Sequence, residues 1–138
     1  MTLVVDASIV LKLYLDEAGS AEAEALLSRP LLFAAPELLL AEVGNAAWKA
    51  VRRGGMTRDQ ARDALRELSN GPIVLTPLAE LAAAATDLAL RRDHPVYDCF
   101  YVALAQREGA PLVTADARLA SAFGSDAEIR LLYPSASA

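Results

Sequence analysis

The stretch LVVDAS, residues 3–8, decides the fold, because it joins a short apolar run directly to an aspartate. Four further short apolar runs follow along the chain, separated by longer segments with helical spacing. These runs are LLFAA (31–35), PIVL (72–75), PLVT (111–114) and IRLLY (129–133). Continuous apolar strands joined by helices indicate a mostly parallel sheet covered on both faces. The sequence therefore predicts an α/β domain with a βαβ order and about five strands.

Three of the intervening segments carry strong helix signals. In MTRDQARDALREL (56–68), Thr57 and Gln60 stand in the capping-box relation. The segment PELLLAEVGNAAWKAVRRGG (36–55) opens with proline and closes with glycines. The segment PLAELAAAATDLALRR (77–92) is rich in alanine and leucine, which are good helix formers. We expect one helix in each of these segments.

The composition fits one soluble domain. The chain has 138 residues, of which 54% are hydrophobic and 22% charged, so it can bury a core without disulfides. We expect residues 1–134 to form this single domain and the small, polar tail 135–138 to be loosely ordered. Cys99 is the only cysteine and is expected to be a small buried hydrophobe, compatible with a reducing cytoplasm.

Charge and hydropathy exclude two classes of protein. No uncharged run approaches the roughly 18 apolar residues that a membrane span needs, so no membrane partner is expected. The net charge of −5 opposes a broad basic surface for nucleic acid, and any such contact must be local. Clustered basic residues are more often solvated helix ends than binding patches. The candidates for a local contact are Arg52, Arg53, Arg91, Arg92 and Arg118.

Three aspartates are expected to meet at one edge of the sheet. Asp6 follows the first apolar run directly, and Asp116 comes just after PLVT. In open parallel sheets, ligands bind beyond the carboxyl ends of the strands. Asp98 falls in the first turn of a helix whose start is marked by His94 and Pro95, where the helix N-terminus favours its charge.

The surroundings of Asp98 make it the least ordinary of these acids. The helix PVYDCFYVALAQ (95–106) is apolar or aromatic at nearly every position around it, so we expect burial on all sides. A buried carboxylate needs a partner, and the chain supplies no obvious cation near these acids. The single histidine, His94, is expected to be a loop or capping residue and not a ligand.

Glu42 is a fourth acid, in the middle of the helix expected over residues 36–55. It shares a helical face with Asn45 and Lys49, and that face could point to solvent or into a cleft. All four acids also have structural explanations. A strand-end aspartate is often a helix N-cap, a first-turn aspartate complements the helix dipole, and a mid-helix glutamate usually faces water.

Bringing these carboxylates together would require a cation. Two carboxylates about 4 Å apart repel by roughly 4 kcal/mol at an effective dielectric constant near 20. Clustered Asp and Glu oxygens suit a hard ion such as Mg²⁺ or Mn²⁺, whereas zinc usually takes His and Cys ligands. One or two such ions can generate hydroxide and stabilise a phosphate during in-line displacement, which suits phosphodiester hydrolysis.

Four segments together resemble PIN-domain proteins, and among them the small bacterial ribonuclease toxins of the VapC type from type II toxin–antitoxin pairs. The segments are LVVDAS, APELLLAEVGNAAWK, HPVYDCFYVALA and LVTADARL, in this order over nearly the whole chain. The resemblance implies a Rossmann-like parallel sheet and a cytoplasmic enzyme that cuts RNA with Mg²⁺ or Mn²⁺. It also implies a cognate antitoxin and a homodimer as partners.

The resemblance also assigns individual residues. Ser8 and Thr114 match hydroxyl positions that often line such pockets, and Asn45 matches a polar position one helical turn after the glutamate. Water, and not the ribose 2′-hydroxyl, would be the nucleophile, leaving a 5′-phosphate and a 3′-hydroxyl. The metal-binding and catalytic acids would be Asp6, Glu42, Asp98 and Asp116.

Two other functions remain alternatives at this point. A phosphohydrolase that passes through an aspartyl phosphate would use Asp6 as its nucleophile. Against it, LVVDAS lacks a second aspartate two positions on, and no lysine follows a late strand. A non-catalytic binding protein with the PIN fold is the second alternative, and the four intact acids argue against it.

Overall fold

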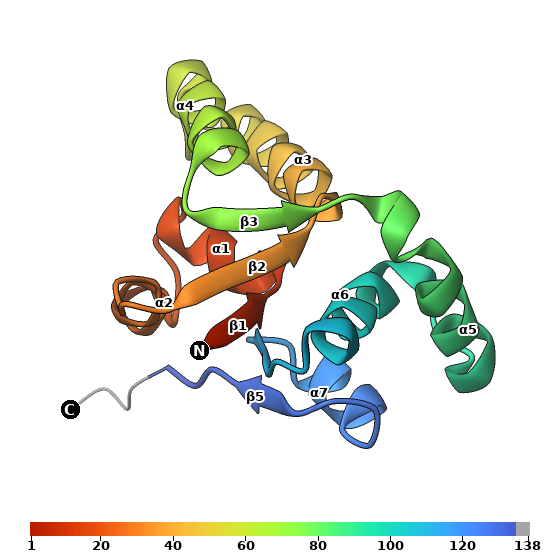
Figure 1. Cartoon of the computed structure of the whole chain (residues 1–138). Helices are drawn as coiled ribbons and strands as arrows, with labels where there is room; N and C mark the ends of the chain where they lie inside the picture. The colour runs from red at the N-terminus through yellow and green to blue at the C-terminus, as the bar shows by residue number, and fades with distance from the viewer. Residues whose placement is uncertain (135–138) are drawn as a thin grey trace.

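A single parallel sheet forms the centre of the molecule in the computed structural model, which describes residues 1–134 (Figure 1). The strand order is β3-β2-β1-β4-β5, and all neighbouring strands pair in parallel. The expected α/β fold with a five-stranded sheet is therefore confirmed, and the expected loose tail 135–138 lies outside the described residues. The strands are β1 (Thr2–Val5), β2 (Leu32–Pro36), β3 (Ile73–Thr76), β4 (Leu112–Thr114) and β5 (Ile129–Leu131).

Seven α-helices and two short 3-10 turns connect these strands in residues 1–134. The first group follows β1 and β2 and comprises α1 (Ala7–Val10), the 3-10 turn Leu11–Leu13, α2 (Ser20–Leu27), α3 (Leu38–Arg52) and α4 (Arg58–Asn70). The second group follows β3 and β4 and comprises the 3-10 turn Leu78–Glu80, α5 (Ala82–Arg92), α6 (Val96–Glu108) and α7 (Ala117–Phe123). No helix in this part of the chain is long and apolar enough to cross a membrane.

The chain changes direction across the sheet between β3 and β4. It runs outward from β1 through β2 to the edge strand β3, then crosses back to β4 on the other side of β1. Because parallel crossovers are right-handed, the helices before and after this reversal cover opposite faces. Accordingly, α3 packs on β2, whereas α6 packs on β1, β2 and β4. The carboxyl ends of β1 and β4 therefore meet at a topological switch point, where open α/β sheets bind ligands.

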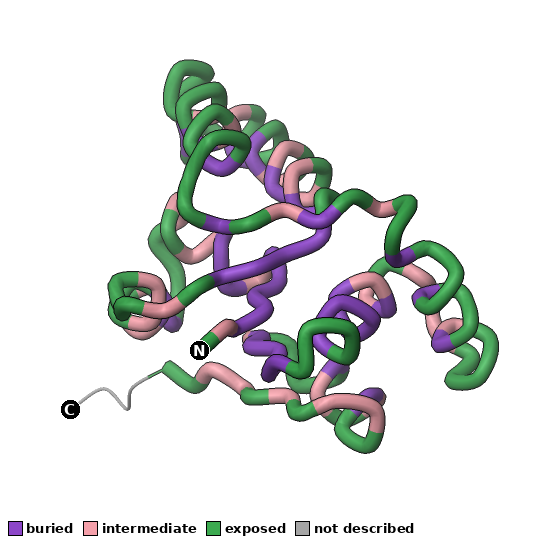
Figure 2. Tube along the Cα trace, in the orientation of Figure 1, coloured by how far each residue is buried: buried purple, intermediate pink, exposed green. Residues whose placement is uncertain are grey.

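Burial follows from this layering (Figure 2). The last three residues of β1 are buried, and so are Cys99, as expected, and residues 101–105 of α6. The expectation that residues 95–106 are buried on all sides is wrong at Gln106, which is exposed, and in the first turn of α6, where Tyr97 is 62% exposed. This first turn holds Asp98 and lies at the strand ends, so packing against the sheet does not enclose it.

Local signals set most helix ends. The capping box of α4 forms as expected, because the Gln60 N–H donates to Thr57 Oγ1 at 3.1 Å and the Thr57 N–H donates to Gln60 Oε1 at 2.9 Å. The helix expected over 77–92 is instead a 3-10 turn followed by α5, because Leu81 between them has φ −111° and ψ −14°. Similarly, Pro36 ends β2 and does not open α3, which begins at Leu38.

Candidate active site

Asp6 lies where β1 ends and α1 begins, and its side chain is held on both oxygens. It is 5% exposed and is the N-cap of α1, because its Oδ1 accepts from the Ile9 N–H at 3.3 Å. The Ser8 hydroxyl donates to the same oxygen at 2.5 Å, and the Thr114 hydroxyl donates to Oδ2. The carboxylate is therefore both a helix cap and a group whose orientation is set by two hydroxyls.

The same two hydroxyls join β1 to β4. Ser8 Oγ accepts from the Ala115 N–H at 2.9 Å, and Thr114 Oγ1 accepts from the Asp116 N–H at 3.0 Å. Each hydroxyl thus donates to Asp6 and accepts from the backbone beyond β4. The network connects the two strand ends at the switch point, and it explains why Thr114 is polar although it is fully buried.

Asp116 caps the helix after β4 in the same manner as Asp6 caps the helix after β1. Its Oδ1 accepts from the Arg118 N–H at 2.9 Å, and the residue is exposed. Its second oxygen, Oδ2, makes no hydrogen bond within residues 1–134. Capping therefore accounts for part of the role of each strand-end aspartate and leaves Asp116 with an oxygen available to a ligand.

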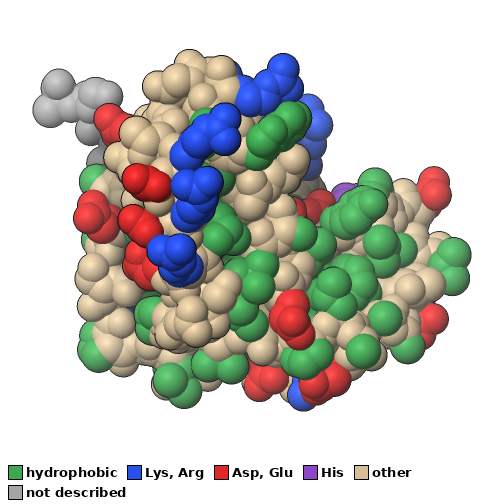
Figure 3. All heavy atoms as spheres, turned by 90° about the horizontal axis from the view of Figure 1, so that it is seen from above, with side chains coloured by type: hydrophobic (Ala, Val, Ile, Leu, Met, Phe, Trp, Pro, Cys, Tyr) green, Lys and Arg blue, Asp and Glu red, His purple; other side chains and the backbone are tan. Residues whose placement is uncertain are grey.

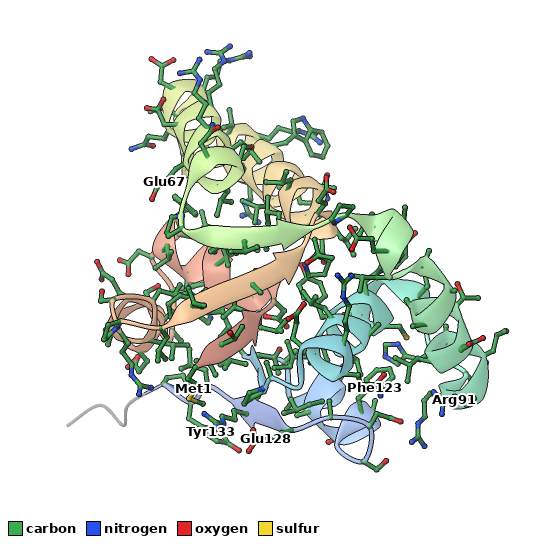
Figure 4. All side chains as sticks on the ribbon, viewed as in Figure 1. Met1, Glu67, Arg91, Phe123, Glu128 and Tyr133 are labelled. Carbon is green, nitrogen blue, oxygen red and sulfur yellow. The ribbon has the colours of Figure 1, made fainter. Side chains whose placement is uncertain are left out.

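Asp98 is partly buried in the first turn of α6, and His94 lies beside it. His94 Nε2 is 3.6 Å from Asp98 Oδ2. The imidazole also packs edge-to-face on Phe123 of α7, with ring centroids 4.9 Å apart. Figure 4 labels Phe123. The expectation that no cation lies near the acids is therefore wrong at Asp98 whenever His94 is protonated, because the loop between α5 and α6 turns the ring toward it.

Glu42 points from α3 toward α6 and not into bulk solvent. Its Oε1 accepts a hydrogen bond of 2.7 Å from the hydroxyl of Tyr101, a residue that is 1% exposed. Tyr101 was not predicted from the sequence as a site residue. Two signals could have identified it: a buried tyrosine usually has an acceptor for its hydroxyl, and this tyrosine lies one helical turn after Asp98. By contrast, Asn45 is exposed and makes no side-chain hydrogen bond within the described residues.

Burial raises the pKa of both Asp6 and Glu42. For Asp6, the hydrogen bonds from Ser8 and Thr114 partly oppose this rise, and the charge of Asp98 adds to it. For Glu42, the hydrogen bond from Tyr101 opposes the rise, and the charges of Asp6 and Asp98 add to it. Each carboxylate is thus destabilised by removal from water and by its acidic neighbours.

Burial also raises the pKa of Asp98, the charge of His94 lowers it, and the charge of Asp116 raises it again. Electrostatic repulsion therefore links all four acids proposed from the sequence, which the fold brings to one edge of the sheet. Across residues 1–134, however, no three His, Cys, Asp or Glu side chains come close enough to form a ready-made metal site. The acids lie within electrostatic reach of one another but do not form a complete coordination sphere.

Comparisons with known proteins agree with this arrangement. The family model for the PIN domain matches residues 3–123. Ribonuclease VapC3 of Pyrobaculum aerophilum is 39% identical to the chain over 125 residues, covering 89% of the chain and 95% of the relative. Ribonuclease VapC1 of Mycobacterium tuberculosis is 36% identical over 131 residues, covering 94% of the chain and 96% of the relative.

Solved structures show the same fold. PAE2754 from Pyrobaculum aerophilum superposes with a TM-score of 0.64 at 27% identity, covering 94% of this chain and 83% of that one. A sarcin-ricin loop cleaving toxin, VapC20 of Mycobacterium tuberculosis, has a TM-score of 0.71 at 20% identity, with coverages of 87% and 94%. A toxin-antitoxin complex from Klebsiella pneumoniae gives 0.72 at 18% identity, with coverages of 96% and 99%. At these last two identities, the likeness is one of fold alone.

Proposed function

The chain belongs to the PIN domain family, and from this premise we propose that it is a metal-dependent endoribonuclease, the toxin of a type II toxin–antitoxin pair. Relatives that match nearly its whole length are named ribonucleases. The observation that carries the proposal is the shared edge at which burial and mutual repulsion raise the pKa values of Asp6, Glu42 and Asp98. Such a cluster favours a bound divalent cation.

The donor set fits Mg²⁺ or Mn²⁺ in its chemistry. All four acids offer carboxylate oxygens, which these hard ions prefer. The only thiol, Cys99, is fully buried in α6, so a thiolate zinc site is not favoured. Asp6, Asp98 and Asp116 would hold the ion, and Glu42 would complete the shell or orient water. Since no complete sphere is preformed, the less buried Asp98 and Asp116 would turn toward the fixed Asp6.

The chain's own residues would prepare this site for hydrolysis. A bound divalent ion would supply a water of lowered pKa and neutralise charge on the phosphate. Ser8 and Thr114 keep the Asp6 carboxylate in one orientation, so little reorganisation accompanies the reaction. Tyr101 does the same for Glu42. Water attacks in line, and the products carry a 5′-phosphate and a 3′-hydroxyl.

The proposed partners are an RNA substrate, a cognate antitoxin and a second copy of the chain. Support for the antitoxin comes from relatives named VapC, and the fold is shared with a chain of a toxin-antitoxin complex from Klebsiella pneumoniae. The pair would act in the cytoplasm. A light-scattering mass equal to one 14.6 kDa chain at all micromolar concentrations would contradict the dimer.

The deciding experiment is incubation of the purified protein with structured and single-stranded RNAs in Mg²⁺, Mn²⁺ or EDTA. The wild type should cleave only with metal, and Asp98→Asn should lose most of this activity. Asp87→Asn, at an exposed carboxylate on α5, is the matched control and should cleave normally. Equal cleavage in EDTA would contradict the metal requirement. RNA binding without cleavage under every condition would favour the non-catalytic alternative.

A further inference from the structure

Positive charge without an acidic partner gathers at one end of the α3–α4 pair. Six of the 13 Lys and Arg side chains form ion pairs in residues 1–134, namely Lys12, Arg62, Arg66, Arg92, Arg107 and Arg130. Four of the seven others lie close together where α3 ends and α4 begins, namely Lys49, Arg52, Arg53 and Arg58. Figure 3 shows Lys and Arg side chains in a row across the face that carries α3 and α4. This local concentration is notable in a chain of net charge −5.

Two of these cations lie on the same face of α3 as the partly buried Glu42. Residues seven and eleven positions apart on an α-helix return to nearly the same face, which places Lys49 and Arg53 in line with Glu42. With a rise of about 1.5 Å per residue, they lie about 10 and 16 Å along the helix from Glu42. Lys49 and Arg52 near the end of α3 are exposed, and so is Arg53, its C-cap. One face of α3 therefore leads from Glu42 in the acidic cluster to exposed cations that have no acidic partner within residues 1–134.

An aromatic side chain lies beside this track. Trp48 is 53% exposed, and the guanidinium carbon of Arg52 lies 4.9 Å from the centre of its ring. An exposed indole flanked by cations is the combination that proteins use to bind single-stranded nucleic acid, because bases stack on the ring and phosphates pair with the cations. Nothing in the core requires a tryptophan at this position.

We propose that single-stranded RNA extends from the acidic cluster along α3, with a base stacked on Trp48 and phosphates contacting Lys49 and Arg53. The name α3 track is used below for Trp48, Lys49, Arg52 and Arg53. The proposal rests on the proposed ribonuclease function and adds to it the path of the strand. The α3 track would supply positive charge, which the four acids of the active site lack. Four carboxylates repel a phosphodiester, so the charge that attracts it must come from nearby residues.

RNA fits the α3 track better than a protein segment does. Trp48 and Val51 also border a shallow apolar hollow between α3 and α4, which a protein could fill. Lys49, Arg52 and Arg53, however, line a separate hollow of their own, and none of them has an acidic partner within residues 1–134. Phosphates would neutralise these charges, and apolar contacts would not.

The test measures binding of a short labelled single-stranded RNA by fluorescence anisotropy at several salt concentrations. All variants carry Asp98→Asn so that the RNA stays intact. Lys49→Gln/Arg53→Gln should lower the steepness of log K against log salt by about 1.4, or roughly 0.7 for each lost phosphate contact. Trp48→Ala should weaken binding about tenfold, and Trp48→Phe should restore much of it, because stacking is worth about 1–3 kcal/mol per base.

The matched control is Arg107→Gln/Arg130→Gln. The side chains of Arg107 and Arg130 are 46% and 45% exposed, but they already form ion pairs with Glu80 and Glu128, respectively. The control should leave both affinity and salt dependence unchanged. A circular-dichroism melt of each variant verifies that it is folded.

The possible outcomes separate the two proposals. If the wild type cleaves RNA but the α3-track variants bind it as tightly as the control does, the path along α3 is wrong and the ribonuclease function stands. If the variants keep RNA binding but change the mass measured by light scattering, the α3 track is a protein interface and the inference is also overturned. If the wild type neither binds nor cleaves any RNA, the proposed function itself fails.

Discussion

The hydroxyl of Tyr101 donates a 2.7 Å hydrogen bond to Oε1 of Glu42, joining two helices on opposite faces of the sheet. Burial and the neighbouring Glu42 charge raise the pKa of Tyr101 above its ordinary value, so the hydroxyl remains a donor throughout the working pH range. The bond leaves the other oxygen of Glu42 free to face the acidic cluster. Tyr101 is thus a positioning residue for a proposed ligand of the metal or its water.

Tyr101→Phe tests this role. The variant keeps the ring in the core but removes the donor, so Glu42 loses its fixed orientation. A hydrogen bond to a charged group is worth about 1.5–3 kcal/mol, so kcat should fall at least about tenfold while KM for RNA changes little. Tyr97→Phe, on the same helix but 62% exposed, should retain wild-type kcat. Equal kcat for both variants would contradict the positioning role.

Thr114 offers a second test, because its buried hydroxyl both donates to Asp6 and accepts from the Asp116 N–H. Thr114→Val keeps the shape of the side chain but leaves the Asp116 N–H without this acceptor. We expect the free energy of unfolding to fall by about 1–3 kcal/mol and cleavage to fall with it. Thr114→Ser should retain the hydrogen bonds and recover most of the activity. Urea unfolding and single-turnover cleavage measure the two effects. If Thr114→Val has the unfolding free energy and the cleavage rate of the wild type, the network does not have this role.

The raised pKa values of Asp6, Glu42 and Asp98 predict how stability depends on pH without metal. A carboxyl whose pKa is higher in the folded than in the unfolded state binds its proton more tightly when folded. Stability is therefore lost as pH rises from the unfolded value of roughly 4 through the folded pKa values. Thermal melting in EDTA should show this loss as the pH is raised above about 4, and the loss should be smaller in Asp6→Asn. If Asp6→Asn loses stability with rising pH more steeply than the wild type does, the raised pKa of Asp6 is contradicted.

Divalent metal should reverse that loss at neutral pH. A ligand that binds only the folded state at about 100 times its Kd stabilises it by about 2.7 kcal/mol. Mn²⁺ should therefore raise the melting temperature of the wild type and have little effect on Asp6→Asn, which should also lose most cleavage while staying folded. Asp87→Asn serves as the control, and Mn²⁺ should raise its melting temperature as it does for the wild type. An equal Mn²⁺ shift in Asp6→Asn would remove Asp6 from the proposed metal site.

Local sequence determined the elements of this protein and where two of its acids lie. Five apolar runs became the five parallel strands, and Thr57 and Gln60 formed their capping box, because these features depend on neighbouring residues. Asp6 and Asp116 stand directly after strands, so the rule that parallel strands present their carboxyl ends together was enough to bring them to one edge. The identity of the metal stays a prediction.

Tertiary structure alone decided how the site is supported. Tyr101 and Glu42 are 59 residues apart in the chain, and Thr114 and Asp6 are 108 apart, so no local pattern couples them. Their hydrogen bonds exist because strand register and helix packing bring β4 beside β1 and α6 across the sheet toward α3. Side-chain orientation at a site depends on contacts between distant segments, and those contacts form only when the whole core is packed.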